Sequence, residues 1–251
     1  MRSLRAAIVF LTRIPVGVGR AGPPQLSRTV PWFPIVGAAI GALVGLVYLA
    51  LAQVLPATLS AAVAVSFGVA VTGAFHIDGL ADCADAFAGG ATVERRLEIL
   101  KDSTLGTYGT SALALVLLVE IAALAALDPT TGLKSLVSAY AIGRGASVCV
   151  MVFSRKAVRE GLGADYITEL SVLRCAVGVF AAIFLVIALN GTQAAVLLVF
   201  ALPPAVLMWA WSHRSIGGVV GDSLGAITQL SQTSVLLGAV TLNSGVCACS
   251  W

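Results

Sequence analysis

Charged residues are scarce in this chain. Of its 251 residues 11% are charged, whereas a typical soluble domain has roughly 25%. Hydrophobic residues make up 59% of the chain, and the mean hydropathy is +0.99. The net charge is only +3, and the basic residues are spread between apolar segments, which argues against a nucleic-acid partner. The composition therefore predicts an integral membrane protein.

The cysteines form no framework. The five cysteines are odd in number, lie mostly inside apolar runs and show no C-x-x-C spacing. Neither a disulfide framework nor a zinc site is therefore indicated. Cys247 and Cys249, the nearest pair, are interpreted as small residues of a terminal helix.

Acidic residues are absent before Asp78. The basic segment 1–30 has arginines instead, and Leu4, Ile8 and Leu11 would share one side of a helix. Such a helix is typical of the headgroup region of an anionic leaflet. No cleavage site follows it, so we expect this segment to stay attached.

Apolar runs of about 20 residues predict an all-α, polytopic transmembrane helix bundle. We expect one integral membrane domain, 1–251, with seven spans at 33–55, 57–74, 110–127, 135–153, 172–189, 194–211 and about 235–249. In the first span, Gly37, Gly41 and Gly45 are four residues apart. They either let another helix approach closely or reflect how common glycine is in membrane helices.

Lysine and arginine predict the orientation. With the N-terminus inside, Lys134 is the one basic residue on the outer side. The cytoplasmic side then holds Arg2, Arg5, Arg13, Arg20, Arg28, Arg95, Arg96, Lys101, Arg155, Lys156, Arg159 and Arg214. The positive-inside rule therefore places the N-terminus and the polar segments in the cytosol.

The segment 72–109 holds half of the twelve carboxylates. Asp78, Asp82 and Asp85 fall at i, i+4 and i+7, which on a helix puts them within about 60° of one another. Three like charges on one face repel unless a cation neutralises them, and oxygen ligands suit Mg²⁺ or Mn²⁺. We therefore predict a metal site.

A run from Lys101 to Gly109 follows, in which a lysine stands beside hydroxyls and glycines. Such a backbone can approach phosphate oxygens closely, and the lysine adds charge. With the carboxylates, the run indicates a phosphate or diphosphate substrate held through Mg²⁺. The alternative is a transporter or channel whose carboxylates line an ion or substrate pathway.

Five stretches resemble the adenosylcobinamide-GDP ribazoletransferase (cobalamin synthase) family. They are TRIPVG (12–17), FPIVGAAIG (33–41), HIDGLADCADA (76–86), RRLEILKDSTLGTYG (95–109) and GGVVGDSLGA (217–226). The chain departs from the family pattern at Cys83, where we expect a small hydroxyl residue. Its tail after Ala226 is generic, which leaves the roles of Gln229 and Gln232 open. By analogy alone, DGLAD is also similar to the acidic signature of CDP-alcohol phosphotransferases.

The resemblance implies transfer of the adenosylcobinamide phosphate moiety from its GDP-activated form to α-ribazole or α-ribazole 5′-phosphate, with GMP leaving. It places the protein in the cytoplasmic membrane of a bacterium or archaeon, in contact with lipid. It leaves open whether the chain forms a homo-oligomer, or also anchors other enzymes of the corrinoid pathway.

The resemblance also implies roles for single residues. Asp78, Asp82 and Asp85 are the expected metal ligands, and Lys101 and Ser103 the expected diphosphate contacts. His76 either deprotonates the attacking hydroxyl or is an orienting hydrogen-bond partner. Further candidates are Asp102 and Asp222 as ligands or bases, and Gly106, Gly109 and Arg144 for substrate binding.

Two more charges, Glu120 and Arg144, are embedded in the third and fourth expected spans. In an antiparallel hairpin they reach similar depth, and a lone charge in the bilayer is costly. We therefore predict that they pair. The alternative is that Arg144 reaches toward the cytoplasmic site and Glu120 is bonded elsewhere.

Overall fold

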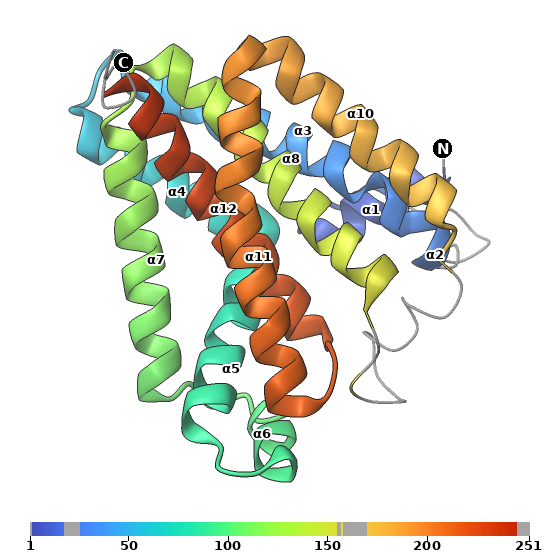
Figure 1. The fold of residues 1–251 in the computed structure, drawn as a ribbon. Helices are drawn as coiled ribbons and strands as arrows, with labels where there is room; N and C mark the ends of the chain where they lie inside the picture. The colour runs from blue at the N-terminus through green and yellow to red at the C-terminus, as the bar shows by residue number, and fades with distance from the viewer. Residues whose placement is uncertain (1, 18–25, 155–156, 158–169, 245–251) are drawn as a thin grey trace, which may run out of the picture.

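The computed structural model describes residues 2–17, 26–154, 157 and 170–244, and within them helices joined by loops make up the fold, as expected for an all-α bundle. The helices, shown in Figure 1, are α1 (Arg2–Leu11), α2 (Leu26–Thr29), η1 (Val30–Trp32), α3 (Phe33–Leu51), α4 (Ala57–Thr72), α5 (Phe75–Gly89), α6 (Val93–Ile99), α7 (Thr107–Ala125), α8 (Pro129–Phe153), α10 (Val172–Asn190), η2 (Gly191–Gln193), α11 (Ala194–Ile216) and α12 (Gly221–Asn243). Arg20, Arg155, Lys156, Arg159, Cys247 and Cys249 lie outside the described residues.

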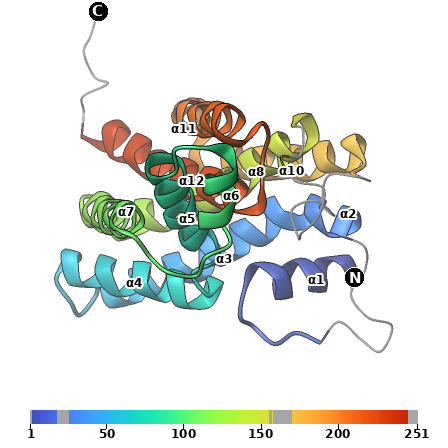
Figure 2. The ribbon, with the colours of Figure 1, turned by 90° about the horizontal axis from the view of Figure 1, so that it is seen from below.

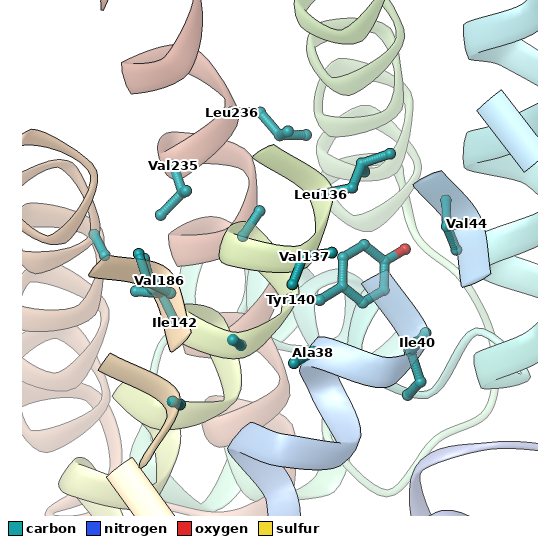
Figure 3. Close-up of a cluster of buried hydrophobic side chains, with 14 of the residues drawn as sticks. Ala38, Ile40, Val44, Leu136, Val137, Tyr140, Ile142, Val186, Val235 and Leu236 are labelled. Atoms are coloured by element: carbon teal, nitrogen blue, oxygen red, sulfur yellow. The ribbon is translucent and has the colours of Figure 1, made fainter. Parts of the chain in front are cut away.

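Helices α3 and α8 pack together at the centre of the molecule. A Cβ atom at Gly37 would collide with the carbonyl oxygen of Tyr140, and one at Gly41 with that of Leu136. The close-approach interpretation of these glycines is therefore confirmed. Around the contact, buried side chains of α3, α8, α10 and α12 form one apolar cluster, part of which Figure 3 shows.

Four segments are long and apolar enough to cross a membrane: Ser27–Leu51, Thr107–Ala125, Pro129–Phe153 and Val172–Ile216. The last contains both α10 and α11, which Figure 1 shows as two rods joined by a turn. A fifth candidate arises if α4 and α5, bent by 89°, count as one broken span. The expected number of seven spans is therefore not confirmed.

The last expected span differs most from the structure. It is expected at about 235–249, whereas α12 runs from Gly221 to Asn243. Residues 245–249 of that expected span lie outside the described residues. The first half of α12 is polar but buried, with Thr228, Gln229 and Gln232 at most 7% exposed. A hydropathy pattern does not reveal a helix whose polar groups are satisfied by other helices.

Helix α4 ends at a sharp elbow. Gly73 and Ala74 both have left-handed backbones, with φ of 62° and 60°, and Ala74 is the one non-glycine residue with positive φ among those described. Arg13 covers the elbow, because its backbone N–H donates to the carbonyl of Val71 at 2.8 Å. The elbow turns α5 away from α4 toward α6 (Figure 1).

Helix α1 is amphipathic, as expected from the N-terminal segment. Ala6, Ala7 and Leu11 are buried, whereas Arg2 and Arg5 are exposed. Figure 2 shows α1 at the periphery of the bundle, next to α3. This arrangement suits a helix that packs on the protein with one side and meets lipid headgroups with the other.

Candidate functional site

Helix α5 positions the acidic motif. Asp78 is exposed and Asp82 and Asp85 are partly buried, while Leu80 and Phe87 of the same helix are buried. Helix α12 packs closely beside α5 (Figure 2), because Gly79 has no side chain: a Cβ there would lie 2.8 Å from the carbonyl oxygen of Asp222. The first turn of α12 thereby reaches the aspartates of α5.

Four carboxylates interact at this place. Asp78, Asp85 and Asp222 all act electrostatically on Asp82. Burial and the nearby Asp78 raise the pKa of Asp222 to about 6, in a helix that is not among the candidate spans. We call Asp78, Asp82, Asp85 and Asp222 the acidic face. Its members come from segments about 140 residues apart, and like charges this close make one another harder to ionise.

Asp85 binds backbone rather than standing free. Its Oδ2 accepts a hydrogen bond from Gly106 N at 2.8 Å, and its Oδ1 accepts one from Gly109 N at 2.9 Å. These N–H groups belong to the N-cap residue and the first turn of α7, so the carboxylate caps that helix. A Cβ at Gly106 would lie 2.5 Å from Asp85 Oδ1. The two glycines predicted to approach phosphate thus approach Asp85 in this structure.

The capped turn holds the loop from Lys101 to Leu105 next to the acidic face. Lys101, Asp102 and Ser103 are all exposed. Asp102 Oδ1 accepts a hydrogen bond from Thr104 N at 3.0 Å, and hydrogen bonding to Thr104 lowers the pKa of Asp102. The loop therefore offers one ammonium, one ionised carboxylate and hydroxyl groups to solvent.

A complete metal site is not preformed. Among the described residues, no three His, Cys, Asp or Glu side chains form a group that could hold a metal ion. The expected three-aspartate site is therefore not shown, and both oxygens of Asp85 already bind backbone. Mg²⁺, however, usually binds through one or two protein carboxylates together with substrate phosphates and water. Asp78, Asp82 and Asp222 have the donor chemistry for that arrangement.

His76 lies on the other side of α5. At 100° per residue, it is about 160° from Asp78 and about 180° from Asp85 around the helix. The side chain is 7% exposed, and its Nδ1 lies 3.4 Å from Nη2 of Arg144. This placement favours the orienting role for His76 over the role of base.

Arg144 and Glu120 do not form the predicted direct pair. Within the described part of the chain the one ion pair is Arg95 with Glu98, on the surface. Gln232 instead lies between the two charges: Arg144 Nη1 donates to Gln232 Oε1 at 2.6 Å, and Gln232 Nε2 donates to Glu120 Oε1 at 3.1 Å. The two charges are therefore linked through the amide of Gln232 on α12 and not by a direct ion pair.

Arg144 does not reach the acidic face either. Its side chain is 2% exposed and its guanidinium contacts Gln232, Tyr140 and His76. The sequence had one signal for this interior cluster, because Gln229, Gln232 and Thr233 recur at helical spacing. Of these three, Gln229 and Gln232 are the residues whose roles the sequence leaves open.

Comparison with known proteins gives a consistent result. A family model described as cobalamin-5-phosphate synthase matches residues 3–240. The adenosylcobinamide-GDP ribazoletransferase of Azorhizobium caulinodans is 38% identical over 248 residues, covering 94% of this chain and 94% of the relative. The proteins of that name from Shewanella frigidimarina and Escherichia coli K12 are each 36% identical, over 92% of this chain and 91% and 96% of the relatives. No solved structure gives a significant match.

Proposed function

Because the chain belongs to the cobalamin-5-phosphate synthase family, we propose that the acidic face and the loop 101–105 are the place where it carries out that family's reaction. The protein is a transferase of cobalamin synthesis. It joins the adenosylcobinamide phosphate moiety of adenosylcobinamide-GDP to α-ribazole or its 5′-phosphate and releases GMP. A transporter is not favoured.

The reaction is a displacement at phosphorus. The ribazole hydroxyl loses its proton and forms a P–O bond to the phosphorus on the corrinoid arm, and the P–O bond to GMP breaks. Charge builds up on the diphosphate oxygens, so catalysis depends on positioning and charge neutralisation. The bond that breaks is therefore expected to lie close to both positive charge and Mg²⁺.

Different residues contribute the charge neutralisation and the positioning. Asp78, Asp82 and Asp222 would hold Mg²⁺, or Mn²⁺, together with the diphosphate, and the ion would supply charge neutralisation. Lys101 and Ser103 bind the diphosphate from the exposed loop. Asp85 keeps that loop in place through the N–H groups of α7.

Asp102 is the remaining candidate base, because it is exposed in the loop beside Lys101 and Ser103. His76, buried behind α5, is assigned an orienting role.

One observation carries the proposal: carboxylates of α5 and α12, distant in the sequence, meet next to an exposed loop with a lysine. The test is turnover by the purified protein with both substrates and Mg²⁺, measured as GMP released. Asp78→Asn and Asp82→Asn should each lower turnover by about a hundredfold or more. Glu98→Gln, an exposed carboxylate of the neighbouring helix α6, should not. A protein that moves corrinoid but releases no GMP would be a transporter.

We also propose that the protein lies in the cytoplasmic membrane with its N-terminus and acidic face in the cytosol. The apolar spans and the exposed arginines of α1 support this orientation. Association with a second copy or with other corrinoid-pathway enzymes remains a prediction.

A further inference from the structure

A line of buried polar side chains joins α7, α12, α8 and α5. Glu120 Oε1 on α7 accepts hydrogen bonds from three groups of α12: Gln229 Nε2 at 2.9 Å, Gln232 Nε2 at 3.1 Å and Thr233 Oγ1 at 2.8 Å. Gln232 Oε1 accepts from Arg144 on α8, which reaches His76 on α5. We call Glu120, Gln229, Gln232, Thr233, Arg144 and His76 the buried network.

The network contains two opposite charges that do not touch. Glu120 is 4% exposed and Arg144 is 2% exposed. An isolated charge at such a place is costly. Gln232 satisfies both, because an amide accepts from a guanidinium with its oxygen and donates to a carboxylate with its nitrogen. A leucine of similar size would leave both charged groups without this partner.

The network ends on the first turn of α5. A guanidinium has only donors, so His76 Nδ1 must accept and the ring proton must be on Nε2. Arg144 is itself held by Gln232 and by the ring of Tyr140, whose centroid lies 4.5 Å from the Arg144 Cζ. The tautomer and orientation of His76 are thus set by residues on three other helices.

Helix α5 needs such support. It begins directly after the left-handed residues Gly73 and Ala74. At this elbow the helical hydrogen bonding is interrupted, so the direction of α5 is not fixed by that of α4. Asp78 follows His76 by two residues and Asp82 lies one turn further, so a rotation of α5 would move both relative to Asp222.

We propose that Glu120 and Gln232 are positioning residues, which act through Arg144 and His76 to hold α5 at the angle that brings Asp78 and Asp82 to Asp222. The proposal rests on the proposed function of the acidic face. None of the six network residues needs to touch substrate for it to hold.

The first test does not depend on activity. The chain has two histidines, and their partners predict opposite tautomers. His213 Nδ1 lies 3.0 Å from the carbonyl oxygen of Trp209, which can only accept, so the neutral His213 ring has its proton on Nδ1. Nitrogen-15 NMR of histidine-labelled protein should show one imidazole of each kind, and His213→Gln assigns the signals.

Gln232→Leu should replace the fixed Nε2–H tautomer of His76 with a mixture. The control Ser231→Ala removes a hydroxyl from the neighbouring buried position, which bonds to Ala201 of α11, and should leave His76 unchanged. Where Gln232→Leu does not fold, Gln232→Asn, with a shorter reach, provides the same readout. Folded variants with the wild-type His76 signals would overturn the proposal.

The second test exchanges two network residues. Glu120→Gln and Gln232→Glu alone should each lower the turnover number of the folded enzyme by about tenfold or more, since small misplacements of reacting groups are costly. The double variant should recover to within about threefold of wild type. In it, the carboxylate at position 232 accepts from Arg144 and the amide at position 120 donates to that carboxylate.

The outcomes separate the two proposals. A wild-type protein that releases no GMP would contradict the proposed function, and the NMR test would still decide on the network. If the wild type is active and the single variants keep normal turnover, the positioning proposal is contradicted. It is also contradicted if the double variant loses as much turnover as the two single variants together.

Discussion

Variants of Asp85 can show whether this carboxylate binds a metal ion or caps helix α7. Each of its oxygens accepts one N–H from the first turn of α7. Asp85→Ala removes both bonds and the charge that favours a helix N-terminus. Loss of a cap costs about 0.5–2 kcal/mol. Because the bonds are partly solvated, we expect about 2 kcal/mol for the pair, or about a thirtyfold rise in local opening.

The assay is amide hydrogen exchange of the segment 101–109 in detergent, compared with exchange in α8. We expect exchange to rise about thirtyfold in 101–109 and to stay unchanged in α8. Asp85→Asn should give a smaller rise, because one amide oxygen replaces two carboxylate oxygens. Turnover should fall in both variants, since Lys101 and Ser103 lose their fixed position.

The Mg²⁺ dependence of turnover then distinguishes a capping role of Asp85 from a metal-binding role. Asp78→Asn should need more Mg²⁺ for half-maximal turnover, whereas Asp85→Asn should keep the wild-type Mg²⁺ dependence at a lower plateau. The capping role is refuted if exchange of 101–109 in Asp85→Ala equals that of wild type. Recovery of Asp85→Asn by high Mg²⁺ would restore Asp85 as a metal ligand.

Three further outcomes follow from the fold. In a cysteine-free background, a cysteine at Asn190 should react with an impermeant thiol reagent from outside and one at Glu98 should not; the reverse would overturn the orientation. Gly41→Ala should cost about 1–3 kcal/mol in unfolding measurements, because its Cβ meets α8, whereas Gly145→Ala, with no atom within 4 Å, should not destabilise. Ala74→Gly should raise the melting temperature by relieving about 1 kcal/mol of left-handed strain, and an unchanged or lower value would contradict that strain.

Local sequence patterns predicted the features that depend on helical periodicity. The aspartates at i, i+4 and i+7 share one face of α5, and the glycines of α3 share one face of that helix, because helical periodicity decides both. That the glycine face packs on α8 is known only from the structure. The amphipathic α1 was predictable for the same reason. The family motifs added Asp222, which spacing along one helix could not reach.

The features that the sequence did not predict depend on how the helices are rotated and bent. The depth of Glu120 and Arg144 follows from the rise per residue, but whether they face each other does not, and Gln232 occupies the space between them. At the elbow, Gly73 is a typical signal for a helix end, but the left-handed Ala74 after it has no sequence signal, since alanine favours continuing a helix. The number of spans also depends on whether α4 and α5, bent by 89°, form one broken span, which a hydropathy pattern does not show.

The central claim is that the acidic face, built from α5 and α12, performs the transfer. The most direct measurement is turnover of Asp222→Asn, with GMP and the corrinoid product quantified together at saturating Mg²⁺. We expect wild type to form the two products in equal amounts and the folded variant to lose about a hundredfold in rate or more. A folded Asp222→Asn protein with the wild-type rate would contradict the claim.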